Sequence, residues 1–582
     1  MTKHRNISIV GIGPRGHFAL ENLVLGLYKK QSLKHIHIRL FEATNNFGNG
    51  PIYRTEQIDS NWINISERIL RLDKREAIHI ETIEIPEFPS YHEWSPIIDS
   101  NKDQYPPRSK IGTYLQQRFT SLITPLVHAN IVTLHNEKVI KLHVAENKSV
   151  TITTSQNCYT DNDDVLVTIG HQPTEPSKQI ETWDTFSSTK NRIVLFKNPY
   201  PIETILSNNL LKPSSTIGVR GFGLAMIDIV RAVANKFGHF SIEDAATMSC
   251  SYHTSYSLEN LLIPFSLDGQ PPVPKPLNGD IDVFFKPSDE ELMTFEKTIG
   301  NPELQKEATG PEFLIEAFSS IAARVFEKNN PEIEKEIPTK TLRHIIECWL
   351  LDPSYQHYTI LSTDQTIEVL MCQFVKMATL ERICSLDYCV GQVWRHCQPS
   401  IYKSLSHNAC SDEVIAEIIG IDETTKRYSY GPPVESIQQL LALSKSGILN
   451  LKMTHNPTIK LQDNGWIIKL NNSKITANIM INSVLDAPNI SAVNSSIIKN
   501  MLCDDLIQPV YSDLGIVTDR YGYIISKEAQ QNSPIALLGR LAKGTVIGVD
   551  AILECFGERP KNWAYKAVEH HINWLKINES TQ

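Results

Sequence analysis

Apolar and polar positions near the start of the chain follow the order strand, turn, helix, strand. Residues 6–10, NISIV, contain β-branched apolar residues and predict a buried parallel strand. Glycines follow at 11, 13 and 16, and residues 14–28 then show the apolar spacing of a helix. A second strand is predicted in HIHIRLFEA, residues 35–43. Together these elements predict a βαβ unit.

A similar pattern recurs after residue 215. Residues 216–219 predict a strand, two glycines follow at 221 and 223, and an amphipathic helix is expected from Leu224. The third glycine position of the first loop is occupied here by Met226, so close packing of the helix on the strand is less certain. We expect the next strand of this unit in MSCSYHTSYS, residues 248–257.

Helical periodicity dominates the next part of the chain. Segments such as EFLIEAFSSIAARVFEKN and VESIQQLLALSKSG show 3.6-residue spacing between about residues 285 and 442. Strand patterns return in GWIIKL and ANIMINSVLDA, and SPIALLGRLAKG near the end predicts a strand followed by a glycine turn. The two nucleotide-type loops are therefore separated from the last strands by a helical insertion.

Composition narrows the class of protein. With 582 residues the chain is too long for one core, and 41% hydrophobic and 21% charged residues are typical of a soluble globular protein. Its 56 basic and 65 acidic residues give a net charge of −9, which argues against nucleic acid or anionic membranes as partners. Apolar runs stay well below the roughly 20 residues that a membrane span needs. The first residues do not resemble a signal peptide, so we expect a cytoplasmic protein.

The ten cysteines are scattered, and their spacing predicts no metal site. Cys384 and Cys389 form a CxxxxC pair, a spacing used by some dithiol flavin reductases. Their context, LERICSLDYCVGQVW, predicts a helix, in which residues five apart lie on different faces. We therefore expect reduced core or surface thiols.

The first glycine loop has the chemistry of a dinucleotide site. Gly11 permits a tight turn, Gly13 lets the backbone approach a pyrophosphate, and Gly16 lets the helix pack on the strand. The helix would direct its first N–H groups at the phosphates. Glu42, after the second strand, is placed to bind ribose hydroxyls. The first helical residues, Pro14 and Arg15, complete the expected set; a glycine turn with a solvated glutamate is the alternative.

The loop after Glu42 favours FAD as the first ligand. It reads NNFGNGPIYRTEQIDSNWINIS and contains Gly50 and Asn64, whereas a simple dehydrogenase proceeds directly to another helix. A strand near residue 164 ends at Gly170 and His171, where flavoproteins of this type cross between domains; a plain strand end is equally compatible.

The second loop predicts a nicotinamide nucleotide. Its expected contacts are Gly221, Gly223 and Leu224, and the absence of an acid in the expected next strand favours NADPH slightly over NADH. A purely structural turn between strand and helix is the alternative.

Several motifs occur in order along nearly the whole chain: GIGPRG, FGNG, YPPRSKIGTYL, VLVTIGHQP, GFGLAMID, DYCVGQVWRHCQP, YSYGPPVESIQQLLAL and LLGRLAKGTVIGVDA. On these motifs the chain resembles the FAD-NAD(P)-binding family of two-dinucleotide flavoproteins. The best-studied members are similar to flavin-dependent N-monooxygenases, some of which oxidise the amine of aspartate stepwise to a nitro group. Met226 and SLDGQPP, residues 266–272, depart from the expected pattern and weaken the inference for NADPH and substrate.

The resemblance implies a reaction and further site residues. An FAD- and NADPH-dependent enzyme of this type oxygenates the amine nitrogen of a small substrate, here an amino acid, with O2 through a C4a-(hydro)peroxyflavin. Asn64 and Arg108 are expected near the isoalloxazine, although a loop amide and a surface arginine are the alternatives. Substrate contacts are expected from Arg395, through the substrate carboxylate, and from Tyr428, although core packing is the more common role of such aromatics. Gly539, Gly544 and Thr545 are expected to return to the FAD.

The sequence therefore predicts an α/β protein with two Rossmann-like dinucleotide-binding domains, for FAD and NADPH, and a helical insertion. A quinone or other reductase, a non-catalytic redox sensor and an assembly partner remain alternatives, and a homo-oligomer is possible. The expected division is 1–180 and 491–582 for the FAD-binding domain, 190–284 and 443–490 for the NAD(P)-binding domain, and 285–442 for the insertion.

Overall fold

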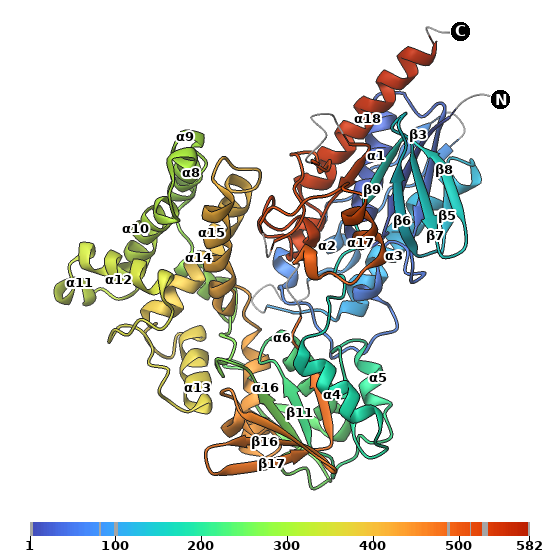
Figure 1. Ribbon diagram of the computed structural model, residues 1–582. Coiled ribbons are helices and arrows are strands. Elements are labelled where there is room, and N and C mark those ends of the chain that lie inside the picture. Colours follow the sequence, from blue (N-terminus) through green and yellow to red (C-terminus); the bar gives the residue numbers. More distant parts are fainter. Residues whose placement is uncertain are drawn as a thin grey trace.

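The computed structural model describes residues 4–80, 83–97, 103–485, 489–511, 514–526 and 533–579. Figure 1 shows three parts: an α/β domain that carries both chain ends, a second α/β domain below it, and a group of helices to the left. We call these the first domain, the second domain and the helical insertion.

The first domain contains a parallel sheet of five strands in the order β19-β9-β1-β2-β5. Alternate residues of β1 face different layers: Ile7 and Ile9 pack with helices α1, α3 and α18, whereas Val10 packs with a strand meander and α17. Because both faces are covered, the strands are apolar on both sides. The elements are β1 (Arg5–Val10), α1 (Pro14–Lys29), β2 (Ile36–Phe41), β3 (Ile78–Ile80), β4 (Ile83–Ile85), α2 (Tyr91–Trp94), α3 (Arg108–His128), β5 (Val132–His135), β6 (Val139–Val144), β7 (Val150–Thr154), β8 (Cys158–Asn162), β9 (Asp164–Val167), α17 (Ser496–Cys503), β19 (Ile535–Leu537) and α18 (Glu558–Glu579).

The second domain is built on a parallel sheet of four strands in the order β10-β18-β11-β14. Its central helix α6 is buried over most of its length, because its apolar residues continue into the core of the helical insertion. The elements are α4 (Lys178–Ser188), β10 (Val194–Phe196), α5 (Ile202–Leu206), β11 (Ile217–Arg220), α6 (Leu224–Phe237), β12 (His239–Asp244), β13 (Ser249–His253), β14 (Leu262–Phe265), β15 (Thr458–Gln462), β16 (Gly465–Leu470), β17 (Ser473–Ala477) and β18 (Ile479–Asn482).

One strand assignment in the second domain is wrong. The strand expected at residues 248–257 is β13, which pairs antiparallel with β12 in a separate hairpin. The parallel neighbour of β11 is instead β14, Leu262–Phe265. β13 and β14 are both short and apolar, so local pattern alone did not separate them.

The helical insertion lies between β14 and β15 and packs around α14. Trp394 of α14 is fully buried and lies edge-to-face on Phe318 of α10. The elements are α7 (Gly279–Asp282), α8 (Asp289–Ile299), α9 (Pro302–Glu307), α10 (Glu312–Asn329), α11 (Ile333–Glu336), α12 (Thr339–Leu351), α13 (Ile367–Ala378), α14 (Leu386–Ser404), α15 (Asp412–Ser429) and α16 (Val434–Lys445).

The start of α14 corrects the expectation for the two cysteines. The helix begins at Leu386, so Cys384 precedes its cap residue and only Cys389 is helical. Because Cys384 lies outside the helix, the expectation that the two thiols lie on different faces of one helix is wrong. Both side chains are buried.

The predicted fold class is confirmed: two parallel sheets of Rossmann type and a helical insertion make up the α/β protein. The chain leaves the first domain after β9 and returns to it with α17, and β19 then pairs beside β9. In the part of the chain that the structure describes, no helix is both long enough and apolar enough to cross a membrane.

Candidate functional site

At the first glycine turn the backbone between β1 and α1 packs directly against Thr168, the residue after β9. Gly11 has φ of +92°, and a Cβ atom there would lie 2.7 Å from the carbonyl oxygen of Thr168. A Cβ on Gly16 would overlap the Gly11 oxygen and lie 2.7 Å from Thr168 Oγ1. These two glycines are therefore required for the fold itself, by backbone conformation and by close packing.

Gly13 serves a different purpose. It is the residue before α1 and makes no side-chain cap, while Pro14 begins the helix. A Cβ on Gly13 would meet nothing nearer than the Cα of Gly50, at 3.8 Å. Gly50 itself has φ of +65° and comes from the loop after β2. The N-terminus of α1 thus faces open space edged by glycine backbone, which fits a pyrophosphate accepted by helix N–H groups.

Glu42 closes the side of this turn. Its carboxylate accepts hydrogen bonds from the Ile12 N–H (3.0 Å), from the Thr44 N–H (3.0 Å) and from the Thr44 hydroxyl (2.7 Å). The side chain is buried at the end of β2, beside the glycine turn. This position fits a ribose contact, and the Ile12 bond adds a structural role that the sequence did not indicate.

The second glycine turn repeats the arrangement with one change. Gly221 has φ of +115°, and Gly223 precedes α6 with nothing within 4 Å of a Cβ placed on it. Leu224 is the first residue of α6, and Met226 is fully buried in the core. Packing against α6 therefore does not need a third glycine, and the open N-terminus fits a second nucleotide.

The residues after β14 bear on the nicotinamide nucleotide. In this type of fold the strand beside the glycine turn presents the group that meets the ribose. Ser266 and Asp268 follow β14, and the Ser266 hydroxyl donates to Asp268 Oδ1 at 2.6 Å. Since the acid-free strand used to favour NADPH was β13, that argument does not apply to this position.

The loop after β19 lies against the start of α1. Arg15 Nη2 donates to the carbonyl oxygen of Val549 at 3.3 Å, and a Cβ on Gly539 would overlap Arg15 Nη1. Thr545 Oγ1 donates to the Ile516 carbonyl oxygen at 3.2 Å. The side chains of Arg15 and Thr545 therefore hold this loop in place. Gly539 and Gly544, with φ of +112° and +111°, leave its backbone free to follow a ligand.

The crossing from the first to the second domain begins at the end of β9. Gly170 has φ of +67° and nothing within 4 Å of a Cβ placed on it. Gly170 and His171 are both exposed. The strand end therefore lies on the surface at the start of the segment that leads to the second domain, and a cofactor role for Gly170 and His171 stays a prediction.

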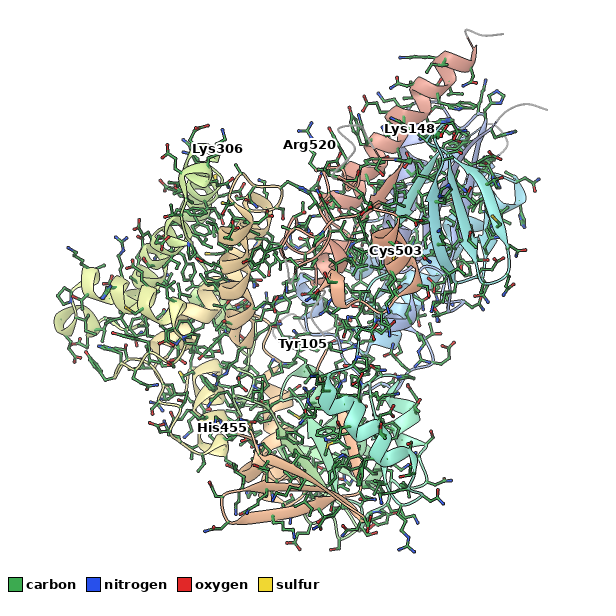
Figure 2. All side chains as sticks on the ribbon, viewed as in Figure 1. Tyr105, Lys148, Lys306, His455, Cys503 and Arg520 are labelled. Carbon is green, nitrogen blue, oxygen red and sulfur yellow. The ribbon has the colours of Figure 1, made fainter. Side chains whose placement is uncertain are left out.

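Asn64 connects the first domain to two separate segments that lie between β14 and β15. Its Nδ2 donates to the Tyr430 carbonyl oxygen at 2.8 Å, at the end of α15. Lys275 Nζ donates to the Asn64 backbone oxygen at 2.5 Å and approaches its Oδ1 at 3.3 Å. Figure 2 labels Tyr105 at the same junction, between the two α/β domains and the insertion. Asn64 thus has a defined place, held by residues from two other parts of the chain.

Lys275 is an unusual lysine. Burial and the Arg395 guanidinium lower its pKa to about 7, against the opposing charges of Asp282 and Asp103. A neutral or readily deprotonated amine therefore lies beside Asn64 near neutral pH. No sequence pattern indicates this lowered pKa, because the lysine stands alone in the proline-rich segment PPVPKPL.

Arg395 is paired with a carboxylate of the protein. Asp282 accepts hydrogen bonds from Arg395, from Arg68 Nη2 at 3.0 Å and from His396 Nε2 at 3.1 Å. Burial opposes the ionisation of Asp282, but His396 and Arg395 hold its pKa well below the usual range. Arg395 therefore pairs with Asp282 in this structure, and its expected contact with a substrate carboxylate stays a prediction.

Arg108 links the two α/β domains. Its Nη2 lies 3.0 Å from Asp228 Oδ2, on α6, and its Nε donates to the Trp62 carbonyl oxygen at 3.2 Å. The Tyr200 hydroxyl also donates to Asp228, at 2.6 Å. Burial raises the pKa of Asp228, and Arg108 opposes that rise. The Arg108 guanidinium thus joins the two α/β domains, and its expected place near the isoalloxazine stays a prediction.

Tyr428 belongs to the core of the insertion. It is buried, its hydroxyl donates to Asp387 Oδ2 at 2.8 Å, and its ring lies edge-to-face on Trp349. A Cβ on Gly391 of α14 would overlap this side chain. Tyr428 therefore packs in the core of the insertion, which was the alternative to a substrate contact.

Two further residues of this site were missed. Asp228 and Arg231 lie on α6 and are both buried. Arg231 Nη1 donates to the Ser60 carbonyl oxygen at 3.2 Å, and its guanidinium lies 3.8 Å from the centre of the Trp62 ring. The available signal was a pair of charged residues, one helical turn apart, inside the apolar run of α6.

The described residues contain no group of three or more histidine, cysteine or acidic side chains arranged to hold a metal ion. The site therefore consists of two nucleotide-type turns and a polar junction between the domains.

Comparison with known proteins gives a family for the first domain. Residues 8–172 match the family model described as FAD-NAD(P)-binding. The chain is 26% identical over 250 residues to nitrosuccinic acid synthase npaA of Aspergillus oryzae; the match covers 41% of this chain and spans only 37% of that protein.

Solved structures give more distant likenesses. L-lysine 6-monooxygenase from Pseudomonas syringae aligns with a TM-score of 0.44 at 10% identity, over 98% of this chain and 100% of that chain. A cyclohexanone monooxygenase mutant from Rhodococcus sp. Phi1, bound to NADP+, aligns with a TM-score of 0.44 at 11% identity, over 98% and 86%. The family match lies on β1, the first glycine turn, Glu42 and β9, which are the elements that form the first site. Residues 8–172 thus match the model of the FAD-NAD(P)-binding family over the part of the chain that forms the first site.

Proposed function

We propose that the protein is an FAD- and NADPH-dependent monooxygenase that oxygenates the amine nitrogen of a small substrate, an amino acid. The observation that carries this proposal is the pair of helix N-termini at Gly13 and Gly223, where no side-chain atom lies within 4 Å of a Cβ placed on the glycine. The choice of amine oxygenation is supported by the likeness to nitrosuccinic acid synthase.

FAD is assigned to the first domain. Backbone N–H groups at the start of α1 would hold its pyrophosphate, and Glu42 would meet the ribose. Gly50 packs closely on Gly13, since a Cβ on Gly50 would lie 3.0 Å from the Gly13 Cα, so glycine backbone borders the start of α1 where the phosphates would bind. The loop containing Gly539 and Gly544 is held against Arg15 and would complete the enclosure.

The nicotinamide nucleotide is assigned to the second domain, at Gly221, Gly223 and the start of α6. We propose NADPH as this nucleotide. Because Asp268 follows β14, turnover with NADPH should be compared directly with turnover with NADH. The Asp268 carboxylate would repel the charged 2′-phosphate of NADPH, whereas it would not repel the neutral 2′-hydroxyl of NADH.

When bound, FAD supplies the redox chemistry: it accepts hydride from NADPH and activates O2. The contribution of the chain is to bind, to orient and to manage protons. An amine must be unprotonated to attack oxygen, and Lys275, with a pKa of about 7, can exchange a proton near neutral pH. The Asn64 amide beside it is held by Tyr430, which fixes one polar wall of the junction.

The substrate carboxylate has a candidate site at this junction. Lys275, Arg68 and Arg395 gather there around Asp282, and Asp103 accepts from Arg68 Nε at 2.6 Å. An amino acid could be held by exchange of one of these pairings for its own carboxylate. The two protein carboxylates would then favour a substrate that brings its own ammonium or amine group.

The test is oxygen incorporation. Purified protein should carry flavin, and NADPH consumption should rise when the right amino acid is added. Under labelled O2 the nitrogen of that substrate should gain labelled oxygen. Fast electron transfer to quinones without product oxygenation would instead establish a reductase, and no NADPH turnover with any acceptor would favour a sensor or assembly role.

A further inference from the structure

Two cysteines occupy paired positions at the start of α14. Ser385 is the cap residue of this helix, so Cys384 stands immediately before the cap and Cys389 is the fourth helical residue. In helices these two positions often contact each other through apolar side chains, an arrangement called the hydrophobic staple. Here both members of the staple are cysteines, which places two thiols side by side.

The two thiols differ in exposure and in pKa. Cys384 is 9% exposed and follows Ile383, which is 72% exposed, whereas Cys389 has no exposed surface. Asn330 Nδ2 donates to Cys384 Sγ at 3.7 Å. Hydrogen bonds from Cys389 and Asn330 lower the pKa of Cys384, while burial raises the pKa of Cys389. The outer thiol is therefore the more readily ionised, and the inner thiol is its neighbour.

We propose that Cys384 and Cys389 form a reversible intramolecular disulfide when the protein meets hydrogen peroxide. The Cys384 thiolate attacks one peroxide oxygen, the O–O bond breaks, and hydroxide leaves as the sulfenic acid forms. Cys389 sulfur then attacks Cys384 sulfur, its S–H proton leaves with the departing hydroxyl as water, and the S–S bond forms. The balance is two thiols and one peroxide giving one disulfide and two waters.

The position of this pair connects it to the central junction. Tyr388, between the two cysteines, donates through its hydroxyl to the Pro274 carbonyl oxygen at 3.2 Å. Pro274 precedes Lys275, and α14 continues to Arg395. Oxidation would therefore covalently fix the helical turn that holds the Lys275 segment. The chemistry of the thiols does not depend on the proposed oxygenase activity, because added peroxide is enough to test it.

Peptide mass spectrometry provides a direct experiment. Trypsin cleaves after Arg382 and Arg395, so both cysteines and no other cysteine fall in one peptide, ICSLDYCVGQVWR. The folded full-length protein is treated with hydrogen peroxide, blocked with an alkylating reagent, unfolded with more reagent and digested. We expect the peptide to be two hydrogens lighter and to take no alkyl group. After dithiothreitol it should take two.

Controls separate this site from general oxidation. Cys384→Ser should abolish the internal disulfide, whereas Cys503→Ser, at an exposed cysteine outside the insertion, should leave its yield unchanged. The next peptide, HCQPSIYK, reports buried Cys397, which should stay alkylatable after unfolding. Two alkyl groups on the wild-type peptide after peroxide would overturn the proposal. So would oxidation of Cys384 beyond the sulfenic acid with Cys389 left free, or a disulfide to a different cysteine.

Discussion

Alanine at Gly13 and alanine at Gly16 should separate ligand binding from folding. A methyl group on Gly13 would lie 3.8 Å from Gly50 Cα, an ordinary contact, so the only folding cost is a poorer helix cap, about 1 kcal/mol. The same methyl group on Gly16 would overlap the Gly11 oxygen and crowd Thr168, and overpacking of this kind costs about 1–3 kcal/mol or more. The open space at Gly13 is where we place the FAD pyrophosphate. We therefore expect Gly13→Ala to weaken FAD binding at least about a hundredfold, or about 2.7 kcal/mol.

The assay measures the affinity for FAD and the thermal stability of the apoprotein on the same preparations. Flavin is removed, FAD is titrated back by fluorescence quenching, and thermal unfolding of the apoprotein is followed in parallel. Gly13→Ala should lose affinity with a nearly unchanged apoprotein melting temperature, and Gly16→Ala should lose stability. Gly223→Ala serves as the matched control, because it also fills open space before a helix but in the second domain. If Gly13→Ala binds FAD as the wild type does, the pyrophosphate does not lie at this turn.

Three further results are expected. Asp228→Ala leaves Arg108 without its partner across the domains and should cost about 3 kcal/mol in urea unfolding; a loss below about 1 kcal/mol would mean that solvent already screens the pair. Tyr428→Phe removes the hydroxyl bound to buried Asp387 and should cost about 1–3 kcal/mol without changing the KM for substrate; a raised KM would return Tyr428 to the substrate site. The pKa of Lys275 is lowered to about 7 in the fold, so its protonation penalises the folded state fully below pH 7, and stability is regained as pH rises from 7 towards the ordinary lysine pKa. Lys275→Met should flatten this part of the stability–pH curve, and an unchanged curve would contradict the assignment.

Local elements of the fold were predictable because their signals are local. The glycines at 11, 13 and 16 determine a turn through their own backbone and Cβ positions, so their pattern in the sequence matched the structure. The partner of β11 was not predictable in the same way. β14 and β18 flank it in the sheet, and β18 lies more than two hundred residues later in the chain. Apolar pattern shows that a segment is a strand, but it does not show which strand lies beside it.

The charged residues of the site show a second limit to prediction from sequence, which concerns the partners of side chains. Arg108 and Arg395 have the chemistry to hold a phosphate or a carboxylate, and the sequence contains nothing that pairs them otherwise. The structure pairs them with Asp228 and Asp282, which are 120 and 113 residues away. An arginine that already pairs with a protein carboxylate can bind a ligand only by exchanging that pairing, and whether such a pairing exists depends on the folded arrangement.

Helix α6 connects the second glycine turn to the loop of the first domain that contains Ser60 and Trp62. Its N-terminus, after Gly223, faces the second site, while Asp228 and Arg231 lie one and two turns further along the same helix. Arg231 binds the Ser60 carbonyl oxygen and stacks on Trp62, and Asp228 holds Arg108, which binds the Trp62 carbonyl oxygen. The segment that leads to Asn64 is therefore fixed by the helix that would receive the nicotinamide nucleotide. Because a helix transmits displacement along its axis with little bending, a shift of α6 on nucleotide binding must move this segment or break these contacts. The order of events in the proposed reaction, nucleotide first and amine oxygenation afterwards, thus has a physical connection in the polar residues of one buried helix.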